Sequence, residues 1–323
     1  MPIGNDLVLA VGSSFQVNPD SQLAQHNSSI TTLSDGRFVV SWYGFNYEPI
    51  DPDCWCFDVP RGMYTLVYAQ IFNADGTVSG SVLDVNPVNF RNEWNPSSIT
   101  ALDGGRFVIA WQDIDSTSGD TSSMAINAQI FNSDGSRFGG VFLVNSTTAS
   151  LQMDPTITTL SGGGFVVSWT DFSQSGGDTS SRAVRAQVYD ANGLRLGGEF
   201  LVNTTTESYQ AAQAITALSG DRFVVAWTDA SQTGGDTSSY AVRAQVFNGD
   251  GSRSATEFLV NTTTNGGQYS PSICELSDGR FIISWVDNSA TGGGVDGNRR
   301  AQMFNNDGTL SGSEFFTEYD NSI

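Results

Sequence analysis

The sequence predicts an all-β protein, a five-bladed β-propeller of four-stranded antiparallel blades. An aromatic and aliphatic run that ends in tryptophan occurs five times, and the last three steps between these tryptophans are 58 residues each. No segment has helical periodicity, and β-branched runs alternate with turn residues. A fixed period of this length is typical of repeat architectures, in which each unit packs against its neighbours. The five tryptophans are Trp42, Trp111, Trp169, Trp227 and Trp285.

One unit, residues 200–258, contains the expected elements in order. Strands are expected at 200–203, 214–218, 223–227 and 240–247, where apolar, β-branched and aromatic residues gather. Residues 219–222 and 248–251 have the composition of tight turns. A longer polar loop, 228–239, separates the third and fourth of these strands. Four strands, two tight turns and two longer loops therefore make one unit.

Radial repetition of such units leaves few open sheet edges, which favours a propeller. A solenoid would need polar caps at its ends, whereas 15–18 and 314–317 carry the same type of strand. Similar ends favour ring closure, assisted by an N-terminal strand at 6–18. We therefore expect one domain over 1–323. The repeats are placed at approximately 19–86, 87–145, 146–203, 204–261 and 262–319.

The charge of the chain excludes several kinds of partner. There are 34 acidic residues against 14 basic ones, all arginine, and the formal net charge is -20. Such a surface repels nucleic acid and anionic membranes. No apolar run approaches the ~20 residues of a membrane helix, and no conventional signal peptide is expected at the N-terminus. An acidic surface suits high ionic strength and attracts cations.

The unit also resembles a repeat of large secreted bacterial proteins, often found beside calcium-binding RTX nonapeptides. The residues that carry the resemblance are the runs 163–169, 184–189 and 198–203, and it extends over almost the whole chain. It implies a module that is secreted or at the cell surface, exported by a non-classical route, as in adhesins. Broadly similar propellers fused to calcium-binding regions occur in cyanobacterial enzymes that alkylate aromatic rings. The RTX nonapeptide itself is missing here, which counts against calcium binding by that route.

Repeated aspartates are candidate metal ligands. In a propeller, the connections between blades and the loops between second and third strands open on one face, and there a Trp-x-Asp motif is followed seven residues later by a second aspartate. Carboxylates on such loops suit a hard cation such as calcium, although no recognised calcium motif is present. The alternative is that they accept backbone hydrogen bonds in turns. The candidates are Asp113, Asp120, Asp171, Asp178, Asp229 and Asp236, with a stretched pair at Asp287 and Asp296.

The repeated tryptophans and the aligned arginines are candidate ligand-binding residues. Aromatic rings facing a groove bind sugars through the C–H side of the sugar, but a ring at the same position in every unit also suits packing between blades. The arginines could likewise pair with neighbouring carboxylates. The candidates are Trp111, Trp169, Trp227, Trp285, Arg185, Arg243 and Arg300.

The first unit departs from the repeat, which predicts a special pocket beside the first two blades. The step from Trp42 to Trp111 is 69 residues rather than 58, and the blade connection 89–95 also differs. Loops as long as 43–64 are usually functional or disordered. For ligand binding the candidates there are Trp55 and Trp94. If the protein is an enzyme, acid/base work would fall to Asp53, Arg61, Tyr64 and Glu93.

The single histidine and the three cysteines suggest no catalytic or metal motif. His26 is expected in the connection that leads into the first strand, without the neighbours of a Ser-His-Asp arrangement. Together with Cys54 and Cys56 it falls short of the four ligands that zinc requires. Cys274 is expected in the core of a repeat strand, and no disulfide framework is expected.

Our first hypothesis is a non-catalytic extracellular module that binds glycans or another polar ligand, in several blades at once and with calcium as the one possible cofactor. The alternative is an enzyme with one pocket at the first two blades, which acts on a polysaccharide or alkylates an aromatic substrate. A second alternative is a structural spacer in a cell-surface protein. Symmetry separates these classes, because a multivalent binder needs its site in several units and an enzyme needs it once.

Overall fold

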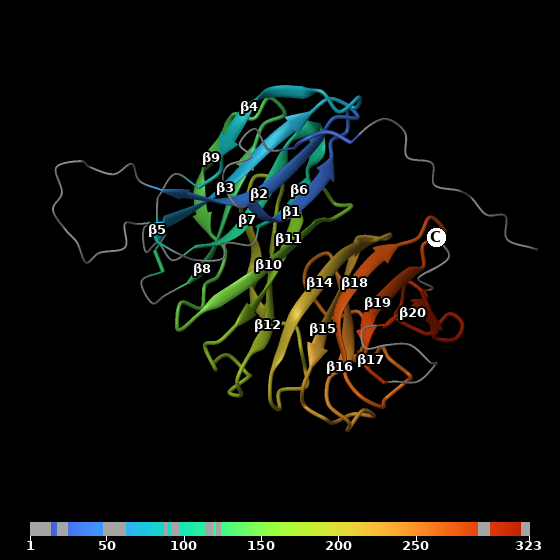
Figure 1. The fold of residues 1–323 in the computed structure, drawn as a ribbon. Helices are drawn as coiled ribbons and strands as arrows, with labels where there is room; N and C mark the ends of the chain where they lie inside the picture. Colours follow the sequence, from blue (N-terminus) through green and yellow to red (C-terminus); the bar gives the residue numbers. More distant parts are fainter. Residues whose placement is uncertain are drawn as a thin grey trace, which may run out of the picture.

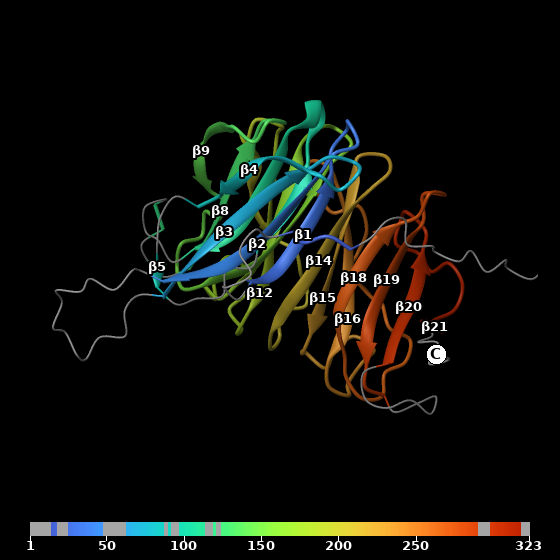
Figure 2. The ribbon, with the colours of Figure 1, turned by 45° about the horizontal axis from the view of Figure 1, so that its top comes forward.

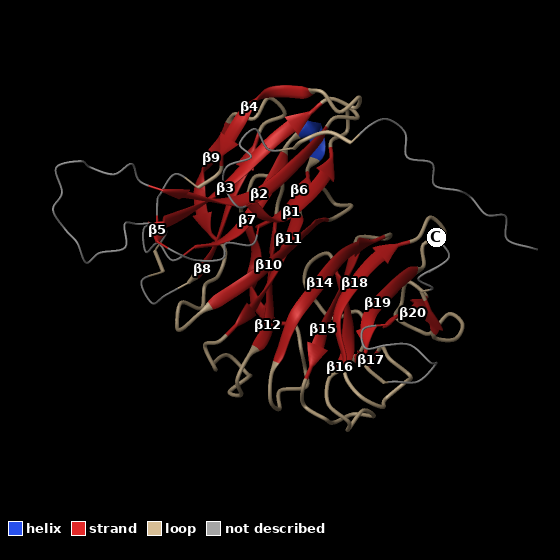
Figure 3. Ribbon diagram, in the orientation of Figure 1, coloured by secondary structure: helices blue, strands red, loops and turns tan. Residues whose placement is uncertain are grey.

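The chain folds into five four-stranded antiparallel blades, which confirms the predicted five-bladed β-propeller. The computed structural model describes residues 14–17, 25–47, 63–86, 90–91, 97–113, 119–120, 124–289 and 298–317. Its one helical element in these residues is a short 3-10 turn, η1 (Asp103–Gly105) (Figure 3). No helix in the described ranges has the length and apolar character needed to span a membrane.

Within each blade the strands follow one another in chain order. The first blade contains β1 (Gln25–Thr32), β2 (Phe38–Tyr47), β3 (Met63–Phe72) and β4 (Val78–Asp84), and β5 (Phe90–Arg91) also pairs with β3. The second contains β6 (Ser97–Ala101), β7 (Phe107–Asp113), β8 (Ala125–Phe131) and β9 (Arg137–Leu143). The third contains β10 (Gln152–Thr159), β11 (Phe165–Asp171), β12 (Ala183–Tyr189) and β13 (Arg195–Leu201).

The last two blades repeat this order. The fourth contains β14 (Gln210–Leu218), β15 (Arg222–Asp229), β16 (Ala241–Asn248) and β17 (Phe258–Leu259). The fifth contains β18 (Gln268–Glu275), β19 (Phe281–Asp287), β20 (Asn298–Phe304) and β21 (Phe315–Phe316). Figures 1 and 2 show the blades following one another in chain order, from the blue β1 to the red β21.

The middle strands form the core because neighbouring blades cover both of their faces. Every residue of β7, β8, β11 and β12 is buried. This explains why β7 and β11 begin with largely apolar runs, rather than with the alternation of a half-exposed strand. In the second to fifth blades, the second strand contributes its tryptophan to a cluster with aliphatic side chains of the preceding blade. Trp169, for example, packs with Val108, Ala128 and Ile130.

A bulge in the first strand recurs in four blades and shapes the end of the blade where the candidate site lies. In the fourth blade the register with β15 shifts between Ala211 and Ala214. The bulge residue has a positive φ, which non-glycine residues adopt rarely. These residues are Asn27 (φ 47), Asp154 (φ 55), Ala212 (φ 53) and Ser270 (φ 53). The bulge therefore changes the direction in which the side chains at the start of the innermost strand point.

In the described residues, the fifth blade does not pack on the first as consecutive blades pack on each other. Consecutive innermost strands pack on each other from β1 through β6, β10 and β14 to β18, but no comparable packing joins β18 to β1 in the described residues. Instead, Phe15 packs on Phe72 of the first blade, with ring centroids 5.5 Å apart. Phe200 contacts Phe247 of the next blade in the same way, at 5.4 Å.

The N-terminal segment thus takes the place that the last strand of a preceding blade would occupy. The described residues 14–17 form no strand, so the expected closing strand at 6–18 is not seen there. Phe315, which lies at the same register of its blade as Phe200, is 38% exposed. Among the described residues, Phe15 thus packs on the first blade, whereas Phe315 of the fifth blade remains exposed.

Candidate functional site

The repeated tryptophans lie inside the core between blades. Trp111, Trp169, Trp227 and Trp285 are all 0% exposed. Each of these rings packs in a cluster that spans two neighbouring blades. A buried ring offers no face to a sugar, so the structure corrects the assignment of these four tryptophans to ligand binding. Their role is the packing of one blade on the next.

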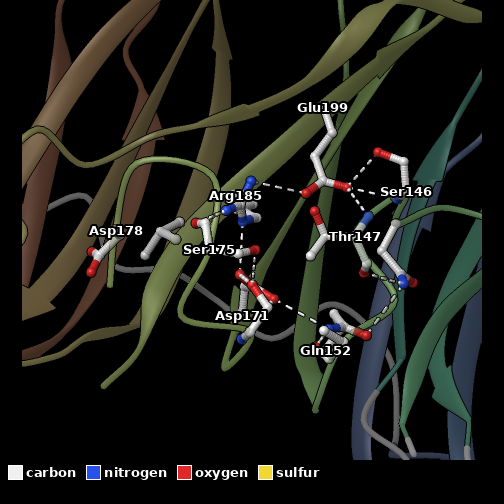
Figure 4. A network of polar contacts seen from close by, with 12 residues as sticks. Ser146, Thr147, Gln152, Asp171, Ser175, Asp178, Arg185 and Glu199 are labelled. Atoms are coloured by element: carbon white, nitrogen blue, oxygen red, sulfur yellow. Dashed lines mark hydrogen bonds and ion pairs between the residues drawn. The ribbon is translucent and has the colours of Figure 1, made fainter. Parts of the chain in front are cut away.

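The aligned arginines are the centres of buried ionic networks (Figure 4). Arg185 Nε donates to Asp171 Oδ2 at 2.7 Å, and its Nη1 donates to Glu199 Oε1 at 3.1 Å. The side chain of Arg185 is 4% exposed and both carboxylates are less exposed still. The same contacts join Arg243 with Asp229 and Glu257, and Arg300 with Asp287 and Glu314. These arginines therefore pair with carboxylates and are not ligand-binding residues, which corrects that assignment too.

The glutamate of each network also links its blade to the preceding one. Glu199 Oε2 accepts hydrogen bonds from the backbone N–H of Ser146 at 2.6 Å and of Thr147 at 3.0 Å. Desolvation pushes the pKa of Glu199 upward, but hydrogen bonds from Thr147 and Ser146 outweigh it and hold that pKa below its ordinary value. Glu257 and Glu314 make the corresponding contacts with residues 204–205 and 262–263. These glutamates were not among the residues predicted from the sequence.

The paired aspartates do not converge on a cation. Asp171 binds Arg185, whereas Asp178 accepts a hydrogen bond from Asn203 Nδ2 at 3.0 Å, and Figure 4 shows the two carboxylates apart. The partners of the equivalent Asp120 and Asp236 are Asn145 and Asn261, and those of Asp113 and Asp229 include Asn127 and Arg243. Across the described residues, no three His, Cys, Asp or Glu side chains come close enough to hold a metal ion. The geometry thus favours hydrogen bonding over calcium binding for these aspartates.

The pocket expected beside the first two blades falls largely on residues that are not described. Five of its predicted residues lie outside the described part of the chain: Asp53, Trp55, Arg61, Glu93 and Trp94. Tyr64 is described only as part of β3. The metal candidate Asp296 of the fifth unit also lies outside the described residues. A different hollow, of about 250 Å³, lies between the N-terminal segment and the first two strands of the first blade. Its lining is Val17, Gln25, His26, Asn27, Ser28, Val40 and Trp42.

Two single residues differ from expectation. His26 lies in β1 rather than in the connection before it, and its ring stacks on Tyr43 with centroids 5.5 Å apart. Cys274 is exposed, not part of the core. At the same register in the third blade, the Thr158 hydroxyl accepts a hydrogen bond from the backbone N–H of Ala217 in the next blade. Cys274 is exposed because the described residues place no further blade against β18.

An aromatic pocket at the third, fourth and fifth blades is the strongest candidate site. This tyrosine pocket has a volume of about 270 Å³ and lies where the innermost strands begin, on the face predicted to bind ligands. The ring centroids of Tyr209 and Tyr240 are 5.8 Å apart, and those of Tyr240 and Tyr269 are 6.4 Å apart. The guanidinium of Arg182 lies 5.4 Å from the centre of the Tyr209 ring. The complete lining is Arg182, Tyr209, Ala211, Ala212, Thr228, Tyr240, Tyr269 and Ser270.

Burial raises the pKa of Tyr209 in the pocket and of Asp154 near Arg182. Desolvation, followed by the hydrogen bond and the charge of Tyr240, raises the pKa of Tyr209 to about 12, although Arg182 opposes the shift. Desolvation also raises the pKa of Asp154, again opposed by Arg182, while the Asp154 side chain keeps contact with solvent. The pocket thus offers phenol hydroxyl groups, aromatic faces and one guanidinium group.

The aromatic residues of the pocket are not part of the repeat. Tyr269 lies at the register that Met153 occupies in the third blade. Tyr240 and Arg182 correspond to Met124, since the carbonyl of each accepts a hydrogen bond from the glutamine that begins the next blade. The departures predicted to matter lay in the first unit. The change of residue type at Arg182, Tyr240 and Tyr269 from one unit to the next is the signal in the sequence that marks this pocket.

Fold and pocket together define a five-bladed propeller with an aromatic pocket. No family model matches the chain, and no curated protein matches its sequence. A solved structure of a protein of unknown function from Dyadobacter fermentans superposes with a TM-score of 0.57 at 11% identity, over 93% of this chain and 85% of that one.

Two further solved structures are named for activities on arabinose-containing substrates. The α-L-arabinanase of Penicillium chrysogenum, complexed with arabinobiose, has a TM-score of 0.53 and 14% identity, over 90% of this chain and 94% of its own. The GH93 α-L-arabinofuranosidase of Fusarium graminearum with arabinobiose has a TM-score of 0.51 and 12% identity, over 87% and 83%. At these identities the similarity establishes the fold alone.

Proposed function

We propose that this protein binds a carbohydrate in the tyrosine pocket. The proposal rests on one observation, the convergence of Tyr209, Tyr240, Tyr269 and Arg182 on a small hollow. Aromatic faces pack against the C–H side of a sugar, while phenol and guanidinium groups bind its hydroxyls. Because the pKa of Tyr209 is about 12, its phenol keeps its proton at neutral pH. The pocket therefore combines the two kinds of contact that a sugar requires.

The fold neighbours support a glycan as the ligand, because two of them were solved with arabinobiose. Among the described residues, the single tyrosine pocket supports one site in place of the multivalent binding that the sequence suggested. Met153 and Met124 replace the aromatic and cationic residues at equivalent positions. We accordingly expect a stoichiometry of one. An extracellular location belongs to the same proposal, and fractionation of the native host would test it.

Titration calorimetry against a panel of oligosaccharides that includes arabinobiose tests this proposal. Tyr269→Ala should weaken binding by roughly 10-fold, because it removes one stacking face. Met153→Ala is the matched control, since it truncates the same register in the third blade. Equal affinity of the Tyr269→Ala variant and the unchanged protein would contradict the proposal.

A second candidate function is the hydrolysis of a polysaccharide. The names of the fold neighbours favour it at least as well as binding alone, since they include an arabinanase and an arabinofuranosidase. A single site also suits an enzyme. Hydrolysis needs two carboxyl groups about 5 to 9.5 Å apart. Asp154, with its raised pKa beside Arg182, is one candidate for an acid, and the sequence offers Asp53 and Glu93 for a second.

Release of reducing ends from arabinan and other plant polysaccharides separates the two functions. If the protein is an enzyme, Asp154→Asn should abolish release while it leaves binding nearly unchanged. If the protein binds an oligosaccharide but releases no reducing ends from any polysaccharide, the result supports a recognition module over an enzyme. If the protein shows no binding and no release, that result favours the structural spacer.

A further inference from the structure

Arg182 differs from the other arginines of the repeat in its surroundings. Its guanidinium lies 4.6 Å from the centre of the Phe172 ring and 5.4 Å from that of Tyr209. By contrast, Arg185 pairs with two carboxylates in the same blade. Among the described residues, Arg182 forms no ion pair, and its side chain is exposed at the edge of the tyrosine pocket. The two rings hold the guanidinium in place without neutralising its charge.

The charge of Arg182 is unusual for its place in this protein. The chain carries a net charge of -20, yet the lining of the tyrosine pocket has one cation and no carboxylate. Met124 and Tyr240 take the place of Arg182 in the second and fourth blades, so packing of the repeat does not require a cation there. Asp154 is the acidic group whose charge interacts with Arg182.

We infer that the tyrosine pocket takes an acidic sugar, a uronic acid at the end of a short glycan, with its carboxylate on Arg182 and its ring on the tyrosines. This inference rests on the proposed carbohydrate binding. A guanidinium suits a carboxylate because two parallel N–H groups can bind its two oxygens. Stacking on Phe172 and Tyr209 orders the side chain before the ligand arrives, which lowers the entropy cost of binding. A long polyanion is disfavoured, because the net charge of the protein repels it.

The test compares sugars that differ only in the carboxylate. We would titrate the full chain with tri-galacturonic acid, its methyl ester and the neutral tri-galactose. The free acid should bind roughly 10- to 100-fold more tightly than the ester or the neutral sugar, the range expected for a charge-assisted hydrogen bond. Arg182→Met should remove this preference, and Arg182→Lys should keep part of it.

Arg106→Met is the matched control. Arg106 also stacks on an aromatic ring, with its guanidinium 4.9 Å from the centre of Phe138, but it does not line the pocket. Its substitution should leave the preference for the acid unchanged. Because the ester comparison uses the unchanged protein, the inference stays testable even if the Arg182 variants do not fold.

Two results would overturn the inference, and only one of them would also overturn the proposed carbohydrate binding. If all three sugars bind equally and Tyr269→Ala weakens them, the acidic class is wrong and the carbohydrate site stands. If none of these sugars and no oligosaccharide of the wider panel binds, both the inference and the proposed function fail.

Discussion

Replacement of Glu257 by alanine should destabilise the protein by about 3 kcal/mol. One carboxylate oxygen of Glu257 accepts hydrogen bonds from the backbone N–H groups of Thr204 and Thr205, at 2.5 and 3.1 Å. The other accepts from Arg243 Nη1 at 3.2 Å. Loss of one partner from a buried ion pair costs about 3–5 kcal/mol. We expect the lower end because Asp229 still binds Arg243 Nε, at 2.8 Å.

Urea unfolding followed by near-ultraviolet circular dichroism gives the free energy of unfolding as the midpoint concentration multiplied by the slope m. The loss is the difference in this free energy between the unchanged protein and the variant. Val141→Ala is the control, since Val141 occupies the position of this glutamate in the second blade, where Asn127 replaces the arginine. It should cost about 1 kcal/mol or less, as expected for a half-buried side chain.

A double variant tests whether the cost comes from the unpaired arginine. Arg243→Met combined with Glu257→Ala should cost less than the sum of the two single changes, with a coupling of at least about 1 kcal/mol. The reasoning fails if Glu257→Ala costs less than about 1 kcal/mol, or if the two single changes simply add. Either result would mean that the network contributes little to the joining of blades.

Three further predictions concern pH, packing and metal. The folded pKa values of Glu199, Glu257 and Glu314 lie below the ordinary 4.5. Their stabilisation is therefore present above the ordinary value and is lost as pH falls through the folded values. Urea-unfolding curves recorded from about pH 6 to pH 3 should show this loss, and the free energy of unfolding of Glu257→Gln should depend less steeply on pH. Trp227→Ala should cost about 3–5 kcal/mol in the same assay, because the ring is fully buried, and a cost below about 1 kcal/mol would refute its packing role. Chelation should leave the melting temperature unchanged, since protein groups already bind Asp171 and Asp178, whereas a rise with added calcium would reveal a site for that ion.

The fold could be predicted because its signal is local and repeated. The run that ends at Trp169 and the turn before it specify a hairpin, and the recurrence of both at Trp227 and Trp285 specifies equivalent blades. What happens at the two ends could not be predicted. Phe15 and Phe315 occur in similar short strands, but only Phe15 packs on the first blade.

The ionic networks and the tyrosine pocket were predicted less well than the fold, because their contacts join distant parts of the chain. Arg185 and Glu199 lie 14 residues apart on neighbouring strands, while Glu199 and Ser146 belong to different blades. Pairing of the arginines with carboxylates was one of two interpretations that the sequence left open, and burial decides between them. The tyrosine pocket was missed because Tyr209, Tyr240 and Tyr269 are single departures at different positions of the unit.

The sequence by itself determined the number of blades, their strand order and the apolar runs that bury them, because these depend on side-chain type at a regular spacing. Tertiary structure alone decided which polar residues face solvent. The tryptophan of the Trp-x-Asp motif that could have bound a ligand is buried against the preceding blade, whereas Arg182 and three tyrosines of different units meet at one surface. The burial of a side chain and the identity of its neighbours are decided only when the blades pack together. These two properties distinguish the residues that stabilise the fold from those available to a ligand.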